Sequence, residues 1–301
     1  MTTRMRAISQ RAVGGPEVLE DVEVDRPEPG PGEVLVRVAA AGVNPADWKL
    51  RAGLVDRIGP PPFTLGLDVS GTVEESDSEA FRPGDEVHGL VLSRSGAYAD
   101  YVVLPGSSLA PKPHLDHVRA AALPSAGLTA WQGLSIVEDG RRVLVHAAAG
   151  GVGHLAVQIA KAKGAHVIGT ARAVNHEFLR GLGADELIDY TEVDFSEAVA
   201  DVDLVLDLVG GDCVPRSLGV LGAGGRVVDA VTWEPDFDDP RYRRMYVEPS
   251  GADLRRLGEL VRQGRLRVEV SEVLPLNAEG AAKAHELSQA GRVRGKIVLV
   301  P

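Results

Sequence analysis

The chain has 301 residues, of which 44% are hydrophobic and 25% charged, a balance typical of a globular protein with one large or two medium domains. Its net charge of -11 argues against a nucleic-acid partner, because neutralising phosphates requires a basic face. The single cysteine excludes an internal disulfide framework, and no stretch has the length and apolarity of a signal peptide or a membrane span. We therefore expect a cytoplasmic protein that does not associate with membranes.

Short apolar or alternating runs, broken by Gly and Pro, fill the chain from Met5 to about Val118. Pro-Gly corners stand before apolar stretches, which is typical of turns that lead into strands. This half is predicted to be all-β, as a barrel or an open sheet, with strands at 34–38, 69–73, 86–90 and 98–103.

The stretch 142–190 is predicted to form a strand, a glycine turn, a helix, a second strand at 167–170, a second helix and a third strand. Its pattern Ala147-x-x-Gly150-x-x-Gly153 is a variant of the dinucleotide-binding fingerprint, and the two strands supply the required context. Glycine allows the turn to approach a pyrophosphate closely, and the N-terminus of the following helix suits an anion. The alternative is that the glycines only terminate elements. We expect the cofactor to be bound by Gly150, Gly151, Val152 and Gly153.

The end of the second predicted strand favours NADPH over NADH. An NAD site places an acidic residue there, whereas this chain has Thr170-Ala171-Arg172 and no carboxylate before Glu177. The guanidinium of Arg172 suits a 2′-phosphate, so Thr170 and Arg172 are candidate NADPH-binding residues. The alternative is that Arg172 is a solvated loop arginine.

Further strands are predicted at 204–207 and 226–229, so that successive βα units form a parallel sheet. The charged and proline-rich stretch 230–249 is predicted to be a loop closed by a strand-like segment at 245–247. An amphipathic helix at 252–264 and, after another helix, a last strand at 296–300 complete the prediction.

Seven segments, taken together, resemble the medium-chain dehydrogenase/reductase superfamily in its zinc-free, NADPH:quinone oxidoreductase-like branch. They lie at 42–53, 65–73, 84–89, 96–102, 127–131, 147–153 and 294–299. The resemblance implies an α/β protein with a GroES-like β domain at 1–118 and 265–301 and a doubly wound, parallel-sheet Rossmann domain at 119–264. It also implies a homodimer, for which the apolar strand at 225–230 is the candidate edge.

The ligands of the zinc-dependent relatives are missing. Asn44 and Gly66-Leu67-Asp68 stand at the matching positions, and a chain with one cysteine has no four-cysteine lobe. We therefore expect no metal. Without zinc, the chemistry that fits is hydride transfer from NADPH to a small-molecule quinone or α,β-unsaturated carbonyl.

By resemblance, Asn44 reaches the nicotinamide and substrate region, and Thr129 lies near the nicotinamide amide, so both are candidate catalytic residues. Tyr190 matches a position near the adenosine 2′-phosphate, and Lys296 one near the cofactor. Each has a structural alternative: a turn residue before Pro45, a hydroxyl bonded within its own helix, a packed surface aromatic, and a charged edge shared with Arg294. Whether Asp47 and Asp68 act in the site is left open.

Two other functions stay open at this point. One is an enoyl-thioester reductase of polyketide or fatty-acid metabolism, and the other is a non-catalytic NADPH sensor. Thioester substrates carry phosphates, so the acidity of the chain leans against the first. Asn44 and Thr129 count against the second.

Overall fold

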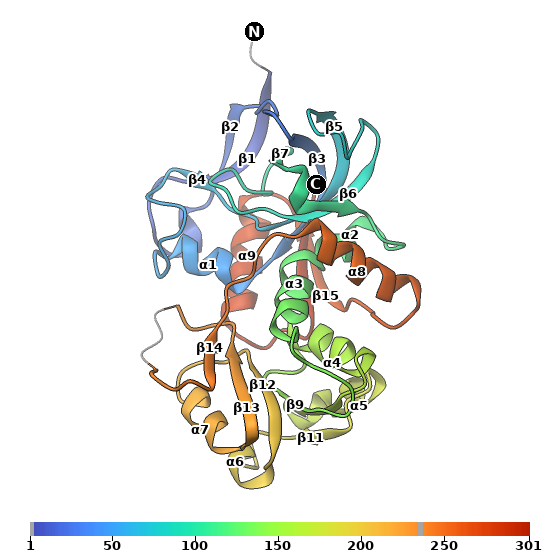
Figure 1. The fold of residues 1–301 in the computed structure, drawn as a ribbon. Helices are drawn as coiled ribbons and strands as arrows, with labels where there is room; N and C mark the ends of the chain where they lie inside the picture. Colours follow the sequence, from blue (N-terminus) through green and yellow to red (C-terminus); the bar gives the residue numbers. More distant parts are fainter. Residues whose placement is uncertain (1–2, 234–236) are drawn as a thin grey trace. The chain divides into compact units, whose positions relative to one another are not determined.

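The computed structural model describes residues 3–233 and 237–301, which form two compact units (Figure 1). The first unit contains residues 3–128, 249–262 and 268–301, and the second contains the described residues of 129–248 together with 263–267. Among the described residues, no helix has the length and apolarity needed to cross a bilayer.

Ten strands build the first unit. They are β1 (Arg4–Gln10), β2 (Glu20–Asp25), β3 (Glu33–Val43), β4 (Phe63–Thr64), β5 (Asp68–Ser76), β6 (Glu86–Leu90), β7 (Tyr101–Pro105), β8 (Leu109–Pro111), β15 (Val270–Pro275) and β16 (Lys296–Val300). One sheet has the order β2-β1-β4, and the other has the order β15-β16-β3-β5-β6-β8, with β7 also paired to β3. The expected GroES-like β architecture is therefore present, as the fold class predicted.

The last 34 residues of the chain complete the sheet of the first unit. Strands β15 and β16 are parallel and are joined by helix α9 (Ala278–Gln289), and β16 then pairs antiparallel with the second half of β3. Strand β3 also pairs with β5 over nearly its whole length. It therefore joins the N-terminal strands of this unit to its C-terminal strands.

Helix α1 (Pro45–Arg51) interrupts the half that was predicted to be all-β. Asn44 is its N-cap, Pro45 occupies the first helical position, and Asp47 closes a capping box with Asn44. Proline at the first position and a reciprocal cap both favour helix initiation, so the local signal Asn-Pro-x-Asp was present in the sequence.

The first unit includes two segments, 119–128 and 249–262, that the predicted boundaries gave to the Rossmann domain. Helix α2 (His117–Ala121) packs on β3 and β5, and helix α8 (Gly251–Arg262) packs on β8. Gly251 lies so close to this strand that a Cβ would be 2.1 Å from the carbonyl oxygen of Leu109. These helices therefore belong to the first unit because of their tertiary packing, which sequence periodicity does not report.

The second unit is built on a six-stranded sheet in which every pairing is parallel. Its order is β11-β10-β9-β12-β13-β14, which is the doubly wound Rossmann order. The strands are β9 (Arg142–Val145), β10 (His166–Thr170), β11 (Glu186–Ile188), β12 (Val202–Asp207), β13 (Leu221–Asp229) and β14 (Tyr242–Arg244). The helices are α4 (Gly153–Ala162), α5 (His176–Gly181), α6 (Phe195–Ala198) and α7 (Cys213–Gly219), while α3 (Pro124–Gly133) runs across the boundary between the units.

Strand β13 is not the edge of this sheet, so the prediction that 225–230 offers a free dimerisation edge is wrong. Strand β14 pairs with Val227 to Asp229 and covers that end of β13. The strand-like segment predicted at 245–247 lies three residues earlier, at Tyr242–Arg244, because this is where the chain comes alongside β13. Residues 234–236 of the predicted loop lie outside the described residues.

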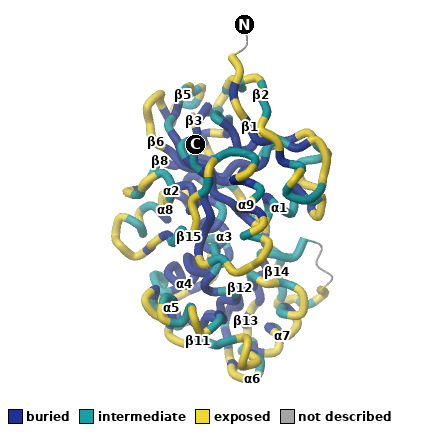
Figure 2. The backbone as a smooth tube through the Cα atoms, turned by 180° about the vertical axis from the view of Figure 1, so that it is seen from behind, coloured by how far each residue is buried: buried dark blue, intermediate teal, exposed yellow. Residues whose placement is uncertain are grey.

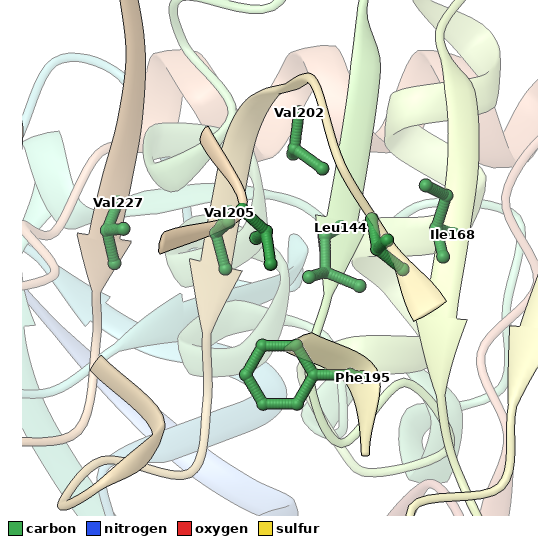
Figure 3. Close-up of a cluster of buried hydrophobic side chains, with 8 residues drawn as sticks. Leu144, Ile168, Phe195, Val202, Val205 and Val227 are labelled. Carbon is green, nitrogen blue, oxygen red and sulfur yellow. The ribbon is translucent and has the colours of Figure 1, made fainter. Parts of the chain in front are cut away.

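One face of the six-stranded sheet carries a compact aliphatic cluster. Leu144, Ile168, Val205 and Val227 come from four neighbouring strands, and Phe195 of α6 packs over them (Figure 3). Helix α4 is buried over Gly153 to Ala160, and its backbone is correspondingly dark in Figure 2. Strands covered on both faces read as continuous apolar runs, which is why these strands were predictable.

Leu144→Ala tests this cluster. Leu144 is fully buried, so the substitution removes apolar contact and leaves a cavity, and we expect the free energy of unfolding to fall by about 2–5 kcal/mol. The measurement is urea unfolding followed by circular dichroism. Val174→Ala is the control, because Val174 is 77% exposed. Equal losses in the two variants would contradict the assignment of Leu144 to the core.

Candidate functional site

A buried polar cluster in the first unit surrounds the ammonium of Lys296. Its Nζ donates to the carbonyl oxygen of Val43 at 3.0 Å, to Asn44 Oδ1 at 2.5 Å and to Asp68 Oδ2 at 3.2 Å. Asn44 Nδ2 in turn donates to Asp68 Oδ2 at 2.9 Å. These bonds close a hydrogen-bonded ring of the three side chains. The ring is buried, because the Lys296 side chain is 4% exposed and that of Asp68 is fully buried.

Strand register brings this cluster together. Asp68 begins β5 opposite Gly42 of β3, while Asn44 follows the end of β3 and Lys296 begins β16. A Cβ on Gly42 would lie 2.8 Å from Asp68 Oδ2 and 2.5 Å from the carbonyl oxygen of Ala121. Glycine at this position therefore leaves the space that the Asp68 carboxylate occupies.

Asp47 and Ser125 hold the cluster from outside. Asp47 Oδ2 accepts the backbone N–H of Asn44 at 2.8 Å, and Asp47 Oδ1 accepts that of Gly66 at 3.0 Å. The N–H of Ser125 donates to Asp68 Oδ1 at 2.7 Å. Burial raises the pKa of Asp47 to about 7, with the Asp68 charge adding to the shift. Both Asp47 oxygens are occupied by backbone donors, so this residue fixes the backbone at Asn44.

The cluster does not fit a zinc ion. Its donors are an amide oxygen and one carboxylate, whereas zinc prefers thiolate and imidazole ligands in a tetrahedral set. An ammonium already lies against both oxygens and would repel a dication. Among residues 3–233 and 237–301, no group of three or more His, Cys, Asp or Glu side chains is arranged to hold a metal.

Tyr98 and His285 form a second buried pair in the same unit, which the sequence did not indicate. The Tyr98 hydroxyl lies 3.3 Å from His285 Nε2, and both side chains are fully buried. Burial raises the pKa of Tyr98, with the Asp47 and Asp68 charges adding to it, while burial and the Arg51 charge lower the pKa of His285 to about 3. Both groups are therefore neutral at physiological pH. Tyr98 precedes β7 and does not belong to the strand that was predicted to contain it.

In the second unit, the glycine turn lies between β9 and α4, as predicted. Ala147 has a φ of 47°, a left-handed conformation that costs a non-glycine residue roughly 1–2 kcal/mol. A Cβ on Gly153 would lie 2.3 Å from the carbonyl oxygen of Ala147, so only glycine fits at the start of α4. Val152 is the N-cap, and Gly150 and Gly151 form the turn before it.

Thr170 ends β10, and its side chain contacts the glycine turn, whereas the sequence predicted a contact with the cofactor. It is 3% exposed, and its Oγ1 accepts the backbone N–H of Ala147 at 3.3 Å and lies 3.1 Å from His146 Nδ1. The hydroxyl is therefore engaged with the turn. Its assignment as a direct cofactor ligand stays a prediction that these contacts do not favour.

Arg172 and Tyr190 follow the neighbouring strands β10 and β11. Two hydrogen bonds join the segments. The N–H of Ala171 donates to the carbonyl oxygen of Ile188 at 3.0 Å, and the N–H of Ala173 donates to the side-chain Oδ2 of Asp189 at 2.7 Å. Tyr190 is 55% exposed, and Arg172 is half-buried. The guanidinium of Arg172 makes no hydrogen bond or ion pair with the residues that the structure describes, so it is available to an anion.

Two aspartates that sequence reasoning missed end neighbouring strands of the same sheet. Asp207 Oδ1 accepts the N–H groups of Val209 and Gly210, and Asp229 Oδ1 accepts those of Val231 and Thr232. Both lie at the carboxyl ends of parallel strands, where open α/β sheets bind their ligands. Burial raises the pKa of Asp207. An aspartate that closes an apolar strand and precedes a glycine or threonine turn is the signal that would have found them.

Three further residues named by the sequence or by their chemistry are Thr129, Arg294 and Cys213. Thr129 is a buried residue of α3 and belongs to the second unit, whereas Asn44 belongs to the first. Arg294 pairs with Glu269 at 3.2 Å on the exposed surface of the first unit. Cys213 is half-buried, and burial beside Asp207 raises its thiol pKa to about 12, so it is unreactive.

Lys296→Met tests the buried ion pair. The variant leaves Asp68 buried and unpaired, so we expect a loss of about 3–5 kcal/mol in the free energy of unfolding. Adding Asp68→Asn removes the unpaired charge, so the double variant is expected to lose less than the sum of the two single losses.

Chemical denaturation of the parent, the two single variants and the double variant measures the coupling between the two charges. Lys283→Met on α9 is the control, because Lys283 pairs with Glu286 at 3.7 Å on an exposed helix face and should cost at most about 0.5 kcal/mol. Strictly additive losses at Lys296 and Asp68 would show that the two charges are not coupled.

Two family profiles match the chain. The profile described as alcohol dehydrogenase GroES-like domain matches residues 30–114, and the profile described as zinc-binding dehydrogenase matches residues 182–299.

Similar proteins match over nearly the whole chain. The chain is 32% identical to the chloroplastic quinone-oxidoreductase homolog of Spinacia oleracea, over 96% of this chain and 95% of that protein. It is also 32% identical to the 2-methylene-furan-3-one reductase of Solanum lycopersicum, over 99% of this chain and 80% of that protein. The solved structure of the quinone oxidoreductase from Coxiella burnetii superimposes with a TM-score of 0.90 at 38% identity, over 99% of this chain and 100% of that one.

Proposed function

The chain belongs to the medium-chain dehydrogenase/reductase superfamily, among its quinone oxidoreductase-like members, and we propose that it is a zinc-independent reductase of quinones or α,β-unsaturated carbonyls that uses NADPH. The observation that carries the zinc-independent part is the Lys296 ammonium, which lies against the oxygens of Asn44 and Asp68. The names of the similar proteins support the substrate class.

The second unit would hold the nicotinamide cofactor. The Gly150 N–H is used within the glycine turn by the carbonyl oxygen of Ala147 at 2.9 Å, so the backbone N–H groups of residues 151–153, at the N-terminus of α4, are the ones that suit a pyrophosphate. Arg172 would pair with the 2′-phosphate, and Tyr190 would pack beside it. When bound, NADPH supplies a hydride, the electron pair that reduces an electron-poor carbon of the substrate.

Asn44 is the residue that we assign to the substrate oxygen. Its Oδ1 accepts from Lys296, and one of its two Nδ2 hydrogens goes to Asp68. The other hydrogen is available to a carbonyl oxygen, and the charge of Lys296 on Oδ1 strengthens Nδ2 as a donor. Negative charge that develops on the oxygen is stabilised by this donor, and the proton that completes the reduction comes from solvent.

The hydrogen bonds of Lys296 argue for a positioning role. An ammonium has three N–H donors, and all three are used by Val43, Asn44 and Asp68. No donor remains for a cofactor phosphate. We therefore propose that Lys296 orients Asn44, in place of the cofactor contact expected from the sequence.

The deciding experiment is steady-state oxidation of NADPH by the purified protein with a panel of small quinones and enones, before and after treatment with a chelator. We expect turnover in both conditions and no stoichiometric zinc by elemental analysis. Loss of activity with loss of a bound metal would overturn zinc independence. Turnover of thioesters alone would favour an enoyl-thioester reductase, and NADPH binding with no turnover of any acceptor would favour a sensor.

Arg172 is expected to set the preference for NADPH. Replacing it with Ala removes the partner of the 2′-phosphate, so we expect the Kd for NADPH to rise by about tenfold or more while the Kd for NADH changes little. Isothermal titration calorimetry gives both constants. Arg180→Ala is the control, since Arg180 is an exposed residue in the last turn of α5. Equal affinities of the parent protein for the two nucleotides would refute the assignment.

Gly151→Val tests the glycine turn. A β-branched side chain there should obstruct the contact between phosphate oxygens and backbone N–H groups, so cofactor affinity should fall at least tenfold, or about 1.4 kcal/mol. The variant should melt near the parent temperature without cofactor and lose the rise in Tm that NADPH gives the parent. Gly219→Val is the control, because Gly219 is exposed and has no atom near the place of a Cβ. A Tm rise in Gly151→Val equal to that of the parent would show that the phosphates bind elsewhere.

We also propose a homodimer. The edge of the six-stranded sheet next to β13 is the three-residue strand β14, which leaves the first half of β13 without a strand partner on that side among the described residues. Unpaired strand edges favour association. Light scattering at micromolar protein concentration should give twice the chain mass, and a monomer mass would refute this proposal.

A further inference from the structure

His146 lies at the centre of a buried hydrogen-bonded chain that connects three elements of the second unit. It follows β9 directly and is 2% exposed. Its Nδ1 is 3.1 Å from Oγ1 of Thr170, at the end of β10, and its Nε2 is 3.1 Å from Oγ of Ser217, in α7. Both hydroxyl groups are themselves buried.

The partners determine which nitrogen carries the proton. Ser217 Oγ donates its hydrogen to the carbonyl oxygen of Cys213 at 2.7 Å, so it accepts from His146 Nε2–H. Thr170 Oγ1 accepts the backbone N–H of Ala147 and donates its own hydrogen to His146 Nδ1. All donors along this path, from the Ala147 amide to the Cys213 carbonyl, therefore point in one direction.

A neutral imidazole is required for this order. Burial lowers the pKa of His146 to about 4, and the charge of Arg216 adds to the shift. Phe195 packs edge-on against the imidazole with the ring centroids 4.5 Å apart, and the guanidinium of Arg216 lies over the Phe195 ring, 4.7 Å from its centroid. The ring is thus held by packing as well as by its two hydrogen bonds.

The chain of hydrogen bonds ends at the strained residue of the turn. Ala147 has the left-handed φ of 47°, and its N–H is the group that Thr170 Oγ1 binds. The neighbouring amides are also tied down, that of His146 to the carbonyl oxygen of Leu206 at 3.1 Å and that of Ala148 to the carbonyl oxygen of Thr170 at 3.0 Å. Strained backbone persists only where surrounding contacts determine it, and such strain is found at ligand-binding turns.

We propose that His146 is a positioning residue that fixes the cofactor-binding turn at Ala147 through the Thr170 hydroxyl, before the cofactor binds. The proposal rests on the proposed function in one respect, that the turn at 147–153 binds a nicotinamide dinucleotide. It assigns Thr170 to the turn and leaves direct recognition of the nucleotide to other residues. Preorganisation of this kind improves affinity because the ordering cost is met in folding.

The test combines His146→Leu, Thr170→Val and their double variant. We expect each single substitution to raise the Kd for NADPH by about tenfold, because each breaks the same path, and the double variant to bind no more weakly than the weaker single one. Thr170→Ser keeps the hydroxyl and should bind like the parent. His166→Leu is the matched control and should also bind like the parent. His166 begins β10, the strand that Thr170 ends, and its side chain is 39% exposed.

Hydrogen–deuterium exchange of the unliganded proteins gives a readout that needs no cofactor. Amides at 147–153 should exchange faster in His146→Leu and Thr170→Val than in the parent, while those of β12 and β13 stay protected. If the parent binds neither NADPH nor NADH, the proposed function fails, and the exchange result alone decides whether His146 fixes the turn. If His146→Leu does not fold, Ser217→Ala breaks the same path at its other end.

Two results would overturn the proposal. Additive losses of affinity in the double variant would mean that Thr170 acts on the nucleotide independently of His146. Unchanged exchange at 147–153 in the folded variants would mean that His146 only fills space.

Discussion

A buried ammonium requires three oxygen acceptors, and the first unit is arranged to provide them. Lys296 begins the last strand of the chain, and its partners come from the end of β3 and the start of β5. This requirement ties the C-terminal segment to the N-terminal half, in addition to the pairing of β16 with β3. It also fixes the orientation of the Asn44 amide, because an amide held by a cation at its oxygen and by a carboxylate at its nitrogen has one favourable orientation.

In the second unit, the constraint lies at the edge of the sheet where the parallel strands end and the loops begin. Side chains at the strand ends accept the N–H groups of the residues that follow. Asp207 and Asp229 do this for β12 and β13, and Thr170 does it across to the turn after β9. The loops at this edge are therefore held by buried groups that belong to the sheet, a common way to combine a rigid scaffold with binding atoms in loops.

Much of the fold was predictable because it depends on local patterns. Apolar runs gave the strands of the parallel sheet, and the glycine spacing gave the turn before α4. Helix α1 was missed although its Asn-Pro-x-Asp signal was present, because the surrounding strand pattern outweighed it. Strand β14 and the membership of α8 depend on packing between distant segments, which no local pattern reports.

The candidate site was predictable as a set of residues but not as a set of interactions. Asn44 and Lys296 were identified separately, and only the register of β16 on β3 brings them within hydrogen-bonding distance. Thr170 was identified from its place at a strand end, yet its hydroxyl contacts His146, which was not a candidate residue in the sequence. Side-chain direction at a strand end is set by the neighbouring strands, so position alone could not give it.

An ammonium in place of a metal has a chemical consequence for the proposed reaction. Zinc in a catalytic site keeps an open coordination position and binds the substrate oxygen itself, whereas the three donors of Lys296 are already used inside the protein. Any polarisation that Lys296 exerts on a substrate must therefore pass through the Asn44 amide as a hydrogen bond, which is weaker than direct coordination to a dication. Such assistance suffices for an acceptor that is already electron-poor and gives little help to an unactivated ketone. In the proposed reaction, this arrangement would favour quinones and conjugated carbonyls over simple carbonyl substrates, on chemical grounds that are independent of sequence similarity.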